Sequence, residues 1–586
     1  MGRILLICIT LLSLVGCGRD TERAPERPPQ AEKTPAEETV PPADLVLRNA
    51  YIYTVDADSR IAQALAIRDG RIAFVGGEEG VTPFVGPATR EEDLGGRMVL
   101  PGFIDANTQA GGPAETVDLY GAKTIEGYLE AVAKFLDQNP ERQVIVGKGW
   151  SGTAFGEGAP HKGQLDQVSD TVPIVLFSSD HQAIWANSEA LAAAGINMDT
   201  PDPPDGVIER DPNGLPIGVM RGQSAIALLE RIIPQKSEEA YRAEIEALQA
   251  ALHRQGITTI HDARFKPRTD ARKLSILQKM AGLGELTVRV RASFEIDGTM
   301  PERIIKELAE HSKKFQDDDF RLQSVKLRTD GRVGTEAAVL KKPYAHREDY
   351  RGESLISQEK LNQQVKRINA ENLQAQVHAI GDGAVHMALR AFVHSRDING
   401  PEDFRNSIAH IQLLDPDDLN LFVETQAIAL MQPACFARQD LFNQVAVPNL
   451  GRERADRQYP ILRLFEKGVT VAAASGCHGE AVGNPLSAIQ VALTRRAVDA
   501  PAESANGESA SGGRVSLARM LRAFTVNGAI ANRLEEETGS IQVGRWGDLI
   551  VLDQNLFQLA PEELHKARVM RTYYKGELVY DAAEAQ

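Results

Sequence analysis

Short apolar segments separated by turns occupy both ends of the chain, and longer apolar runs alternate with helical patterns between them. Asp69-Gly70 and Lys575-Gly576 each stand between two apolar segments, a spacing typical of tight β-hairpins. The terminal strands predicted by this pattern fall within residues 44–55, 63–76, 547–555 and 567–581. We therefore expect one β segment at each end of the chain.

The middle of the chain predicts a different architecture, because buried strands alternate there with amphipathic helices. The predicted strands are residues 172–177, 257–262, 286–295, 321–328, 373–381, 406–412, 427–433 and 469–475. The predicted helices include residues 360–372, 384–396 and 515–524. Such alternation indicates a parallel sheet, and the number of repeats favours a closed barrel over an open sheet.

The first residues form a targeting segment. An apolar run over residues 4–14 follows Arg3 and ends at Leu14-Val15-Gly16-Cys17. The run is too short to span a bilayer and has the small-residue exit of a secretory signal. Its ending resembles a bacterial lipobox, which implies cleavage after residues 1–16 and lipidation of Cys17. An ordinary signal peptide or a buried N-terminal helix is the alternative.

Residues 17–43 are rich in Pro and Glu and contain no aromatic residue, so they cannot bury a core. We expect an extended tether that links the lipid to the folded part. Gly18 after the cysteine favours the outer membrane in this resemblance. The protein is therefore expected in the bacterial cell envelope, with membrane contact through its N-terminal lipid only.

Composition narrows the choice of partners. The 586 residues are 42% hydrophobic and 25% charged, as in ordinary globular proteins. Lys and Arg number 65 against 81 Asp and Glu, which gives a net charge of −16. An acidic chain without basic clusters is not expected to bind nucleic acid. The expected partner is a small-molecule substrate or ligand.

Several motifs carry a resemblance to a known family. Residues 100–106 (LPGFIDA) resemble the first barrel strand of the amidohydrolase superfamily, in its amidohydrolase-3 branch, which contains N-substituted formamide deformylase-like enzymes. Further matches follow in the order of that branch. They include Gly147–Trp150, Trp185–Leu191, Val325-Lys326 with Asp330-Gly331, His378–Asp382, His410–Gln412, Met431–Pro433 and Thr525–Asn527. The resemblance extends over residues 44–582.

The resemblance implies a fold as well as a function. It predicts an α/β protein with a distorted (β/α)8 barrel over residues 101–538, interrupted by an insertion at about 112–222. Residues 44–100 and 539–586 would pair into a composite β-sandwich, since neither segment alone has enough strands to bury a face.

In this superfamily a divalent cation activates a water molecule for attack on a carbonyl group. Lys326, His378 and His410 match the lysine and the two histidines of the family's second metal position. The alternatives are that Lys326 forms a plain ion pair with Asp330 and that the two histidines are satisfied core residues. The resemblance therefore implies one divalent metal, with zinc as the expected ion, and a carboxylated Lys326. Asp330 and Asp382 are the nearest motif carboxylates for a catalytic base.

Other family positions are substituted. Asn107 and Gln109 stand where the family has its His-x-His, and neutral amides bind zinc-like ions far more weakly than imidazole does. Gln182 takes the place of another family histidine. Cys477 stands at the position of the last-strand aspartate, and Cys435 follows Gln432-Pro433 where the branch often has histidine.

Three arrangements of the two cysteines are open. Cys435 and Cys477 could complete a closed N2S2 zinc site with His378 and His410, because thiolates are strong ligands for zinc. They could form a disulfide, which an oxidising envelope compartment permits. They could also be unrelated buried thiols. Coordination by Cys477 alone would leave the metal an open position for water.

Two functions from different classes follow. The first is a metal-dependent hydrolase that acts on a C–N bond of the amide or formamide type with a reduced, mononuclear site. The alternative is a catalytically inactive lipoprotein of the same fold that serves as a ligand-binding or scaffold protein. The substitutions at residues 107, 109, 182 and 477 favour the alternative, because they fall on one functional unit.

Overall fold

The structure of the protein is a computed structural model, and its folded unit begins at Pro42. The described residues are 40–584 except 109–115, 120–121, 123, 156–158, 179–182, 205, 235–236, 267–269, 297–302, 438–441, 475–482 and 499–513. The predicted signal peptide, Cys17 and most of the predicted tether lie outside the described residues.

The central element is an eight-stranded parallel sheet. Its order is β21-β20-β19-β18-β17-β16-β15-β8, so seven consecutive strands of the chain are neighbours in the sheet and β8 follows β15. The strands are β8 (Phe103–Thr108), β15 (Ile257–Phe265), β16 (Arg289–Ile296), β17 (Phe320–Arg328), β18 (Gln374–Ala379), β19 (Ser407–His410), β20 (Ile428–Met431) and β21 (Val471–Ala473). The predicted distorted (β/α)8 barrel is confirmed.

The barrel closes through a seam that is bridged by other groups. The ladder pairs recorded for the described strands run from β21 round to β8, and β21 and β8 also contact each other. The backbone N–H of Ile104 in β8 donates to the carbonyl of Phe524. The side-chain amide of Asn527 donates to the carbonyl of Val471 in β21 over 2.9 Å. In a regular barrel the edges of β8 and β21 would pair directly. Here the segment around α17 provides hydrogen-bond partners for backbone groups of these two strands.

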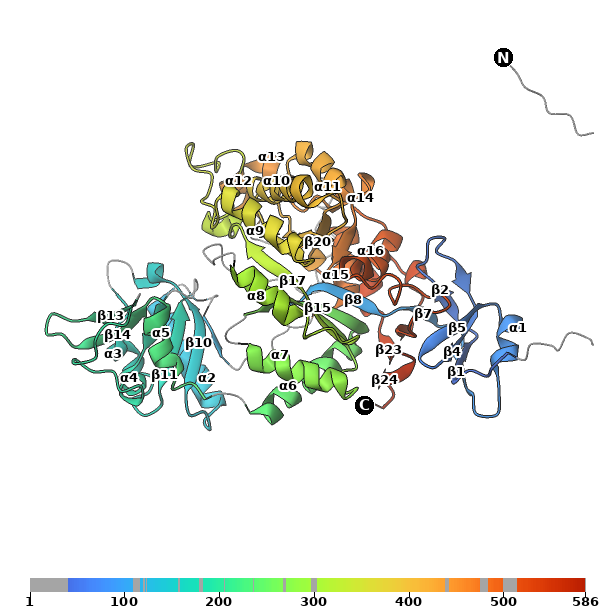
Figure 1. Cartoon of the computed structure of the whole chain (residues 1–586), viewed down its shortest axis with the longest axis horizontal. Coiled ribbons are helices and arrows are strands. Elements are labelled where there is room, and N and C mark those ends of the chain that lie inside the picture. Colours follow the sequence, from blue (N-terminus) through green and yellow to red (C-terminus); the bar gives the residue numbers. More distant parts are fainter. Residues whose placement is uncertain are drawn as a thin grey trace, which may run out of the picture. The chain divides into compact units, whose positions relative to one another are not determined.

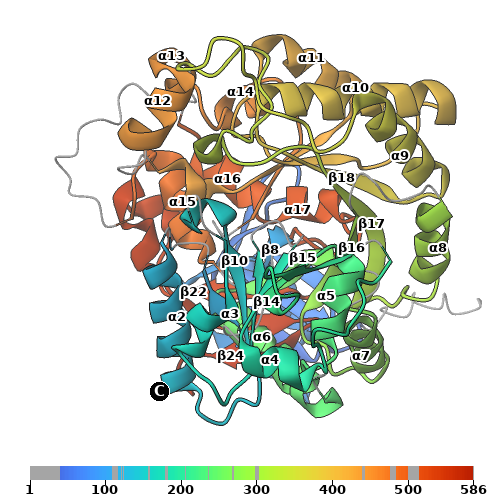
Figure 2. The ribbon, with the colours of Figure 1, turned by 90° about the vertical axis from the view of Figure 1, so that its left-hand side faces the viewer.

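Helices pack on the outer side of these strands, where α8 lies beside β17 and α9 and α10 beside β18 (Figures 1 and 2). Their apolar faces bury Leu361, Val365 and Ile368 of α9 and Val385, Leu389 and Phe392 of α10. The helices of this part are α6 (Glu238–Arg254), α7 (Ala271–Gly282), α8 (Arg303–Ser312), α9 (Gln358–Ala370), α10 (Asp382–Asn399), α11 (Leu419–Thr425), α12 (Val447–Leu450), α13 (Arg452–Asp456), α14 (Ile461–Glu466), α15 (Pro485–Thr494), α16 (Leu517–Ala523) and α17 (Val526–Ala531).

The two terminal segments build two further sheets. One has the order β5-β4-β1-β6 and the other β24-β23-β22-β7-β2-β3, so the second sheet mixes strands from both ends of the chain. The strands are β1 (Leu45–Arg48), β2 (Tyr51–Tyr53), β3 (Ile61–Ala62), β4 (Ala64–Arg68), β5 (Arg71–Gly76), β6 (Arg90–Asp93), β7 (Met98–Pro101), β22 (Leu549–Leu552), β23 (Val569–Tyr574) and β24 (Glu577–Asp581), with the short helix α1 (Glu78–Val81) after β5.

One apolar cluster joins these two sheets. It contains Leu47 and Ile67 of the first sheet with Val99, Val551 and Tyr573 of the second. Because strands from residues 51–101 and 549–581 are needed to complete the second sheet, neither end could bury this face alone. The predicted composite sandwich is confirmed.

Both predicted hairpin turns are present. Asp69 and Gly70 have φ values of 51° and 73°, and Lys575 and Gly576 have φ values of 50° and 80°. Two successive residues with positive φ are the geometry of a type I′ turn, whose twist matches that of the flanking strands. The turns join β4 to β5 and β23 to β24 in antiparallel pairs.

The insertion forms its own mixed sheet, with the order β13-β14-β12-β11-β10-β9. Its elements are β9 (Val117–Asp118), α2 (Ile125–Gln138), β10 (Ile145–Trp150), α3 (Lys162–Asp166), β11 (Ile174–Ser178), β12 (Ala183–Ala186), α4 (Ser188–Ala193), β13 (Val207–Arg210), β14 (Pro216–Arg221) and α5 (Gln223–Glu230). The apolar run at 172–177 is thus a strand of this sheet and not of the barrel. None of the described helices has the length and apolar character of a membrane span.

A matched pair of glycine variants tests the packing of α17 against the barrel. A Cβ added at Gly528 would lie 2.8 Å from Cβ of Ile104, whereas one added at Gly282 in α7 would meet nothing within 4 Å. We expect Gly528→Ala to lower the free energy of unfolding by about 1–3 kcal/mol through overpacking. Gly282→Ala should be neutral or slightly stabilising. Denaturant midpoints measure both, and equal midpoints for the two variants would contradict this packing.

Candidate functional site

The predicted site lies on three neighbouring barrel strands. Lys326 is the seventh residue of β17, His378 the fifth of β18 and His410 the last of β19. The ladder pairs Lys326 with Gln376, and His410 with Ala379, which follows His378. Since parallel strands carry their carboxyl ends to one end of a barrel, the three side chains belong to the same end.

The two histidines are in direct contact. Their ring centroids are 4.3 Å apart and the ring planes meet at 64°. Nδ1 of His410 lies 2.5 Å from Oε1 of Gln432, and since an amide oxygen only accepts, Nδ1 must be the donor. This contact fixes the tautomer of His410 and leaves a lone pair on its Nε2. Nε2 of His378 is buried and has no hydrogen-bond partner among the described residues.

Backbone conformation supports the placement of His410. The φ angle is 82° at His410 and 45° at Ile411, the left-handed region that a β-branched residue rarely enters. The N–H of Ile411 donates to the carbonyl of Ala379, and the N–H of Leu413 to that of Ile380. These bonds tie the end of β19 to the end of β18 and hold the strained turn beneath the imidazole.

The electrostatics of the site favour neutral nitrogen ligands. Burial and the charge of Lys326 lower the pKa of His410 to about 3. Burial, with the neighbouring His410, places the pKa of His378 well below its usual value. Burial lowers the pKa of Lys326 to about 8, although the charge of Glu295 opposes the shift. Near neutral pH both imidazoles are uncharged, and a fraction of Lys326 is a free amine.

Lys326 has few contacts of its own. Its residue is 2% exposed, and no hydrogen bond or ion pair joins its ammonium group to another described residue. Glu295 and Asp262 supply the favourable charges, from β16 and β15. A buried lysine with a lowered pKa, and without an ion pair to another described residue, has the properties of an amine that can react with carbon dioxide or accept a ligand.

The carboxylate of Asp330 holds neighbouring backbone segments through hydrogen bonds. Its carboxylate accepts from the backbone N–H groups of Ile380, Gly381 and Val339 at 2.9, 2.9 and 3.0 Å. Burial raises the pKa of Asp330 to about 7, against the effect of these three donors. A Cβ at Gly381 would lie 2.0 Å from the carbonyl oxygen of Val339, so only glycine allows this approach.

Asp382, the first residue of α10, holds the same loop. Its carboxylate accepts from the N–H groups of Lys341 and Gly383 at 2.9 and 3.0 Å. The contacts of Asp330 and Asp382 are those of residues that position the loop after β17, and we therefore place neither of them in the chemistry proposed below.

The substituted positions are partly described. Asn107 is 2% exposed, and neither atom of its amide has a hydrogen-bond partner among the described residues. Cys435 is disulfide-bonded, so its sulfur is not a thiolate ligand, and this contradicts both the N2S2 site and the free thiol at this position. Gln109, Gln182 and Cys477 lie outside the described residues. Among the described residues, no group of three or more His, Cys, Asp or Glu side chains is placed to hold a metal ion, and this includes the surroundings of His378 and His410.

Sequence reasoning missed two residues of the site. Gln432 orients His410 through its contact with Nδ1. The sequence shows the motif Met431-Gln432-Pro433 after a predicted strand, but the motif does not reveal this contact. Gln376 is 1% exposed with both amide atoms unpartnered among the described residues, and it pairs in register with Lys326. The sequence contains one signal for Gln376. This residue lies two positions before His378 in a strand, and alternate side chains of a strand share a face.

Comparison with known proteins decides the family. The sequence profile Amidohydro_3, described as "Amidohydrolase family", matches residues 90–580. The chain belongs to the amidohydrolase family.

Relatives of this amidohydrolase match along nearly their whole length. Protein LONG AFTER FAR-RED 3 of Arabidopsis thaliana is 29% identical over 549 residues, which cover 92% of each chain. N-substituted formamide deformylase of Arthrobacter pascens is 24% identical and covers 92% of this chain and 98% of its own. A solved structure, an uncharacterized metal-dependent hydrolase from Pyrococcus horikoshii, has a TM-score of 0.66 at 21% identity, over 88% of this chain and 99% of that one. That likeness supports the fold.

The burial of His261 in β15 predicts that the stability of this amidohydrolase depends on pH. His261 contacts Asn532 through Nδ1 and Ser293 through Nε2, each at 2.7 Å, and burial lowers its pKa to about 4. In the unfolded chain the pKa of His261 is about 6.5. Between pH 6.5 and 4, the unfolded chain therefore binds a proton at this histidine and the folded chain does not. The stability contribution is present above pH 6.5 and is lost as pH falls toward 4.

We expect His261→Gln to reduce the loss of unfolding free energy between pH 6.5 and 4 by about 3 kcal/mol relative to the parent. Denaturant titrations at several pH values measure this difference. His386→Gln is the control, because His386 lies on α10 beside Asp418 and its side chain is 39% exposed. If the parent and His261→Gln lost stability equally over this range, the burial of His261 would be contradicted.

Proposed function

We propose that this amidohydrolase is a metal-dependent hydrolase with a reduced site for one divalent cation, held by His378, His410 and a carboxylated Lys326. The observation that carries the proposal is the contact of two neutral imidazoles, one with an unpartnered, buried Nε2. Imidazole nitrogens are preferred ligands of zinc, and we infer zinc as the ion. The chemistry that such an ion supplies is a water molecule of lowered pKa.

The residues of the chain have separate tasks in this proposal. Gln432 holds the ring of His410 and keeps its Nε2 unprotonated, as outer-shell partners of metal ligands do. Lys326 is available for carboxylation because burial lowers its pKa to about 8. Carboxylation would also turn a buried cation into an anion, which removes its repulsion of a metal. The amides of Asn107 and Gln376, which have no hydrogen-bond partner among the described residues, are available to bind polar groups of a substrate.

We propose a C–N bond of an amide or formamide type in a small molecule as the target. This choice rests on the full-length similarity to N-substituted formamide deformylase, whose name states its substrate class. A carbonyl carbon in such a bond is the centre that an activated water attacks.

A non-catalytic role is the second candidate. Asn107 stands in place of a metal-binding histidine, and Cys435 is committed to a disulfide. With these losses the same buried, unpartnered groups would bind a small polar ligand without turnover. A folded protein that never retains zinc would favour this candidate.

For cellular location we propose the bacterial envelope, with Cys17 lipidated and the folded part tethered at the outer membrane. The support is the sequence of residues 4–17 and the Pro- and Glu-rich segment that follows.

Metal content tests the site. We expect the mature protein, loaded with zinc and dialysed, to retain about one zinc per chain. The double variant His378→Gln with His410→Gln should retain none, because carboxamides are poor zinc ligands. His386→Gln should retain as much zinc as the parent. Elemental analysis by mass spectrometry measures all three, and zinc retained by the double variant would contradict the assigned ligands.

The same preparations test activity. The parent should release primary amine from N-substituted formamides, and the double histidine variant should show a loss of at least about 100-fold. Retained zinc without amine release from any amide or formamide substrate would instead support the ligand-binding candidate.

Membrane anchoring has an independent test. In a bacterial host with lipoprotein processing, the full chain should sediment with membranes, and Cys17→Ala should release it to the soluble envelope fraction. Cys8→Ala, inside the apolar run, is the matched control and should sediment like the parent. Membrane association of Cys17→Ala would contradict lipidation of this residue.

A further inference from the structure

Two arginines are fully buried at the opposite end of the barrel strands. Arg289 is the first and Arg291 the third residue of β16, and both are 0% exposed. Residues two apart in a strand point to the same face, so the two guanidinium groups share one environment. Burying a guanidinium group without a counter-charge costs several kcal/mol. The partners of Arg289 and Arg291 therefore determine whether their charges are compensated.

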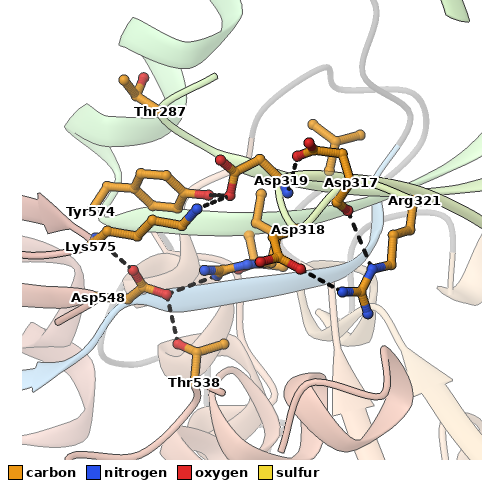
Figure 3. Close-up of polar contacts among 12 residues, drawn as sticks. Thr287, Asp317, Asp318, Asp319, Arg321, Thr538, Asp548, Tyr574 and Lys575 are labelled. Atoms are coloured by element: carbon orange, nitrogen blue, oxygen red, sulfur yellow. Dashed lines mark hydrogen bonds and ion pairs between the residues drawn. The ribbon is translucent and has the colours of Figure 1, made fainter. Parts of the chain in front are cut away.

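Arg289 has one carboxylate partner. Its Nη1 donates to Oδ2 of Asp548 at 2.8 Å and lies 3.3 Å from Oγ1 of Thr259. Asp548 also accepts from the hydroxyl of Thr538 at 2.8 Å and from the backbone N–H of Lys575 at 2.9 Å (Figure 3). Nε and Nη2 of Arg289 have no hydrogen-bond partner among the described residues, and both are shielded from solvent.

Arg291 has no carboxylate partner in the described part of the chain. Its Nη1 and Nη2 donate to the backbone carbonyls of Val290 and Asp318 at 3.2 and 3.1 Å. Its Nε is buried without a partner among the same residues. Burial, followed by the charges of Arg289 and Arg321, lowers the pKa of Arg291 to about 9. Arg291 therefore has no direct counter-charge among the described residues.

The remaining charges around this pair compensate one another. Asp319 accepts from the hydroxyl of Tyr574 at 2.6 Å and pairs with the ammonium of Lys575 at 2.5 Å. Arg321 pairs with the exposed carboxylate of Asp318 at 2.7 Å. Figure 3 draws both pairs together with Asp548. Once Asp548 is assigned to Arg289, the charge of Arg291 is left over.

Two other carboxylates do not fill this role. Asp317 accepts from the backbone N–H of Asp319 at 2.8 Å and is partly exposed. Glu537 is partly exposed and acts on Arg291 through its charge, without a hydrogen bond to it.

We propose that one small monovalent anion of the chloride class binds between Arg289 and Arg291. Three buried N–H groups without a partner among the described residues, Nε and Nη2 of Arg289 and Nε of Arg291, provide the donors. The charge of Arg291, which has only backbone acceptors there, sets the valence. A water molecule would satisfy hydrogen bonds and leave the charge uncompensated. A phosphate or sulfate dianion is larger, costs more to dehydrate and would overcompensate the charge.

The anion would join the barrel to the C-terminal segment. Arg289 belongs to a barrel strand, whereas Asp548 precedes β22 and Lys575 lies in the β23–β24 turn of the sandwich. A counter-ion between the arginines removes the repulsion that Asp548 alone does not cancel. The role is structural, and it is independent of the hydrolase activity proposed above.

Thermal unfolding of the mature full-length protein tests the site. Chloride is titrated at constant ionic strength against gluconate, and also against fluoride, which is strongly hydrated. We expect the melting temperature to rise by about 1 °C for each tenfold increase in chloride above its dissociation constant. Crystals soaked in bromide should show one anomalous peak between the Arg289 and Arg291 side chains.

Two variants separate specific binding from general salt effects. Arg291→Met removes the excess charge, and we expect it to abolish the chloride dependence and the bromide peak. Arg452→Gln, which breaks the partly exposed pair with Asp456 on α13, should retain both. If Arg291→Met does not fold, the parent titration and the bromide soak still decide. Equal melting temperatures in chloride and gluconate, or bromide crystals without a peak there, would overturn the proposal.

Discussion

The carboxylate of Asp330 is the contact on which the geometry of the site depends. It lies four residues after Lys326 and accepts from the N–H groups of Ile380 and Gly381, just beyond His378 in the chain. A third bond, from Val339, ties the loop after β17 to the same point. Val339 in turn accepts from the N–H of Gly383 in α10. These bonds hold Lys326, His378 and the loop after β17 in fixed positions relative to one another. They also require a buried carboxylate, and burial raises the pKa of Asp330 to about 7.

Burial has opposite consequences at the two ends of the barrel. At the carboxyl end it keeps His378 and His410 neutral and lowers the pKa of Lys326, so the side chains are ready to accept a cation. At the amino end the arginines keep their charge, because guanidinium hardly deprotonates, and a counter-charge must be provided. Burial therefore suits one end of this amidohydrolase to the cation that we propose there, and the other end to the proposed anion.

The sequence predicted the fold well, because the signals were local. The alternation of apolar strands and amphipathic helices predicted the barrel, and Asp69-Gly70 and Lys575-Gly576 predicted hairpins that require two positive φ angles. The strand at residues 172–177 joined the insertion sheet instead, since a short apolar run does not reveal its partner strands. The sandwich depended on the resemblance, because the pairing of β7 with β22 joins distant segments.

The sequence predicted which residues lie near the site, but it predicted their individual roles less well. Motif order singled out Lys326, His378 and His410, and the structure places the two histidines in contact. The roles of Asp330 and Asp382 could not be predicted, because their backbone partners lie in a loop and a strand end that come together only in the fold. The unpartnered amide of Gln376 was hidden for the same reason, since an amide in a strand is ordinary until its neighbours are known.

X-ray absorption at the zinc edge of the loaded protein tests the central claim most directly, because it counts the ligand atoms. We expect nitrogen and oxygen neighbours of the zinc at about 2.0–2.2 Å, with the multiple-scattering signature of two imidazole rings. Sulfur neighbours at about 2.3 Å, or a spectrum without imidazole scattering, would contradict a site built on His378 and His410.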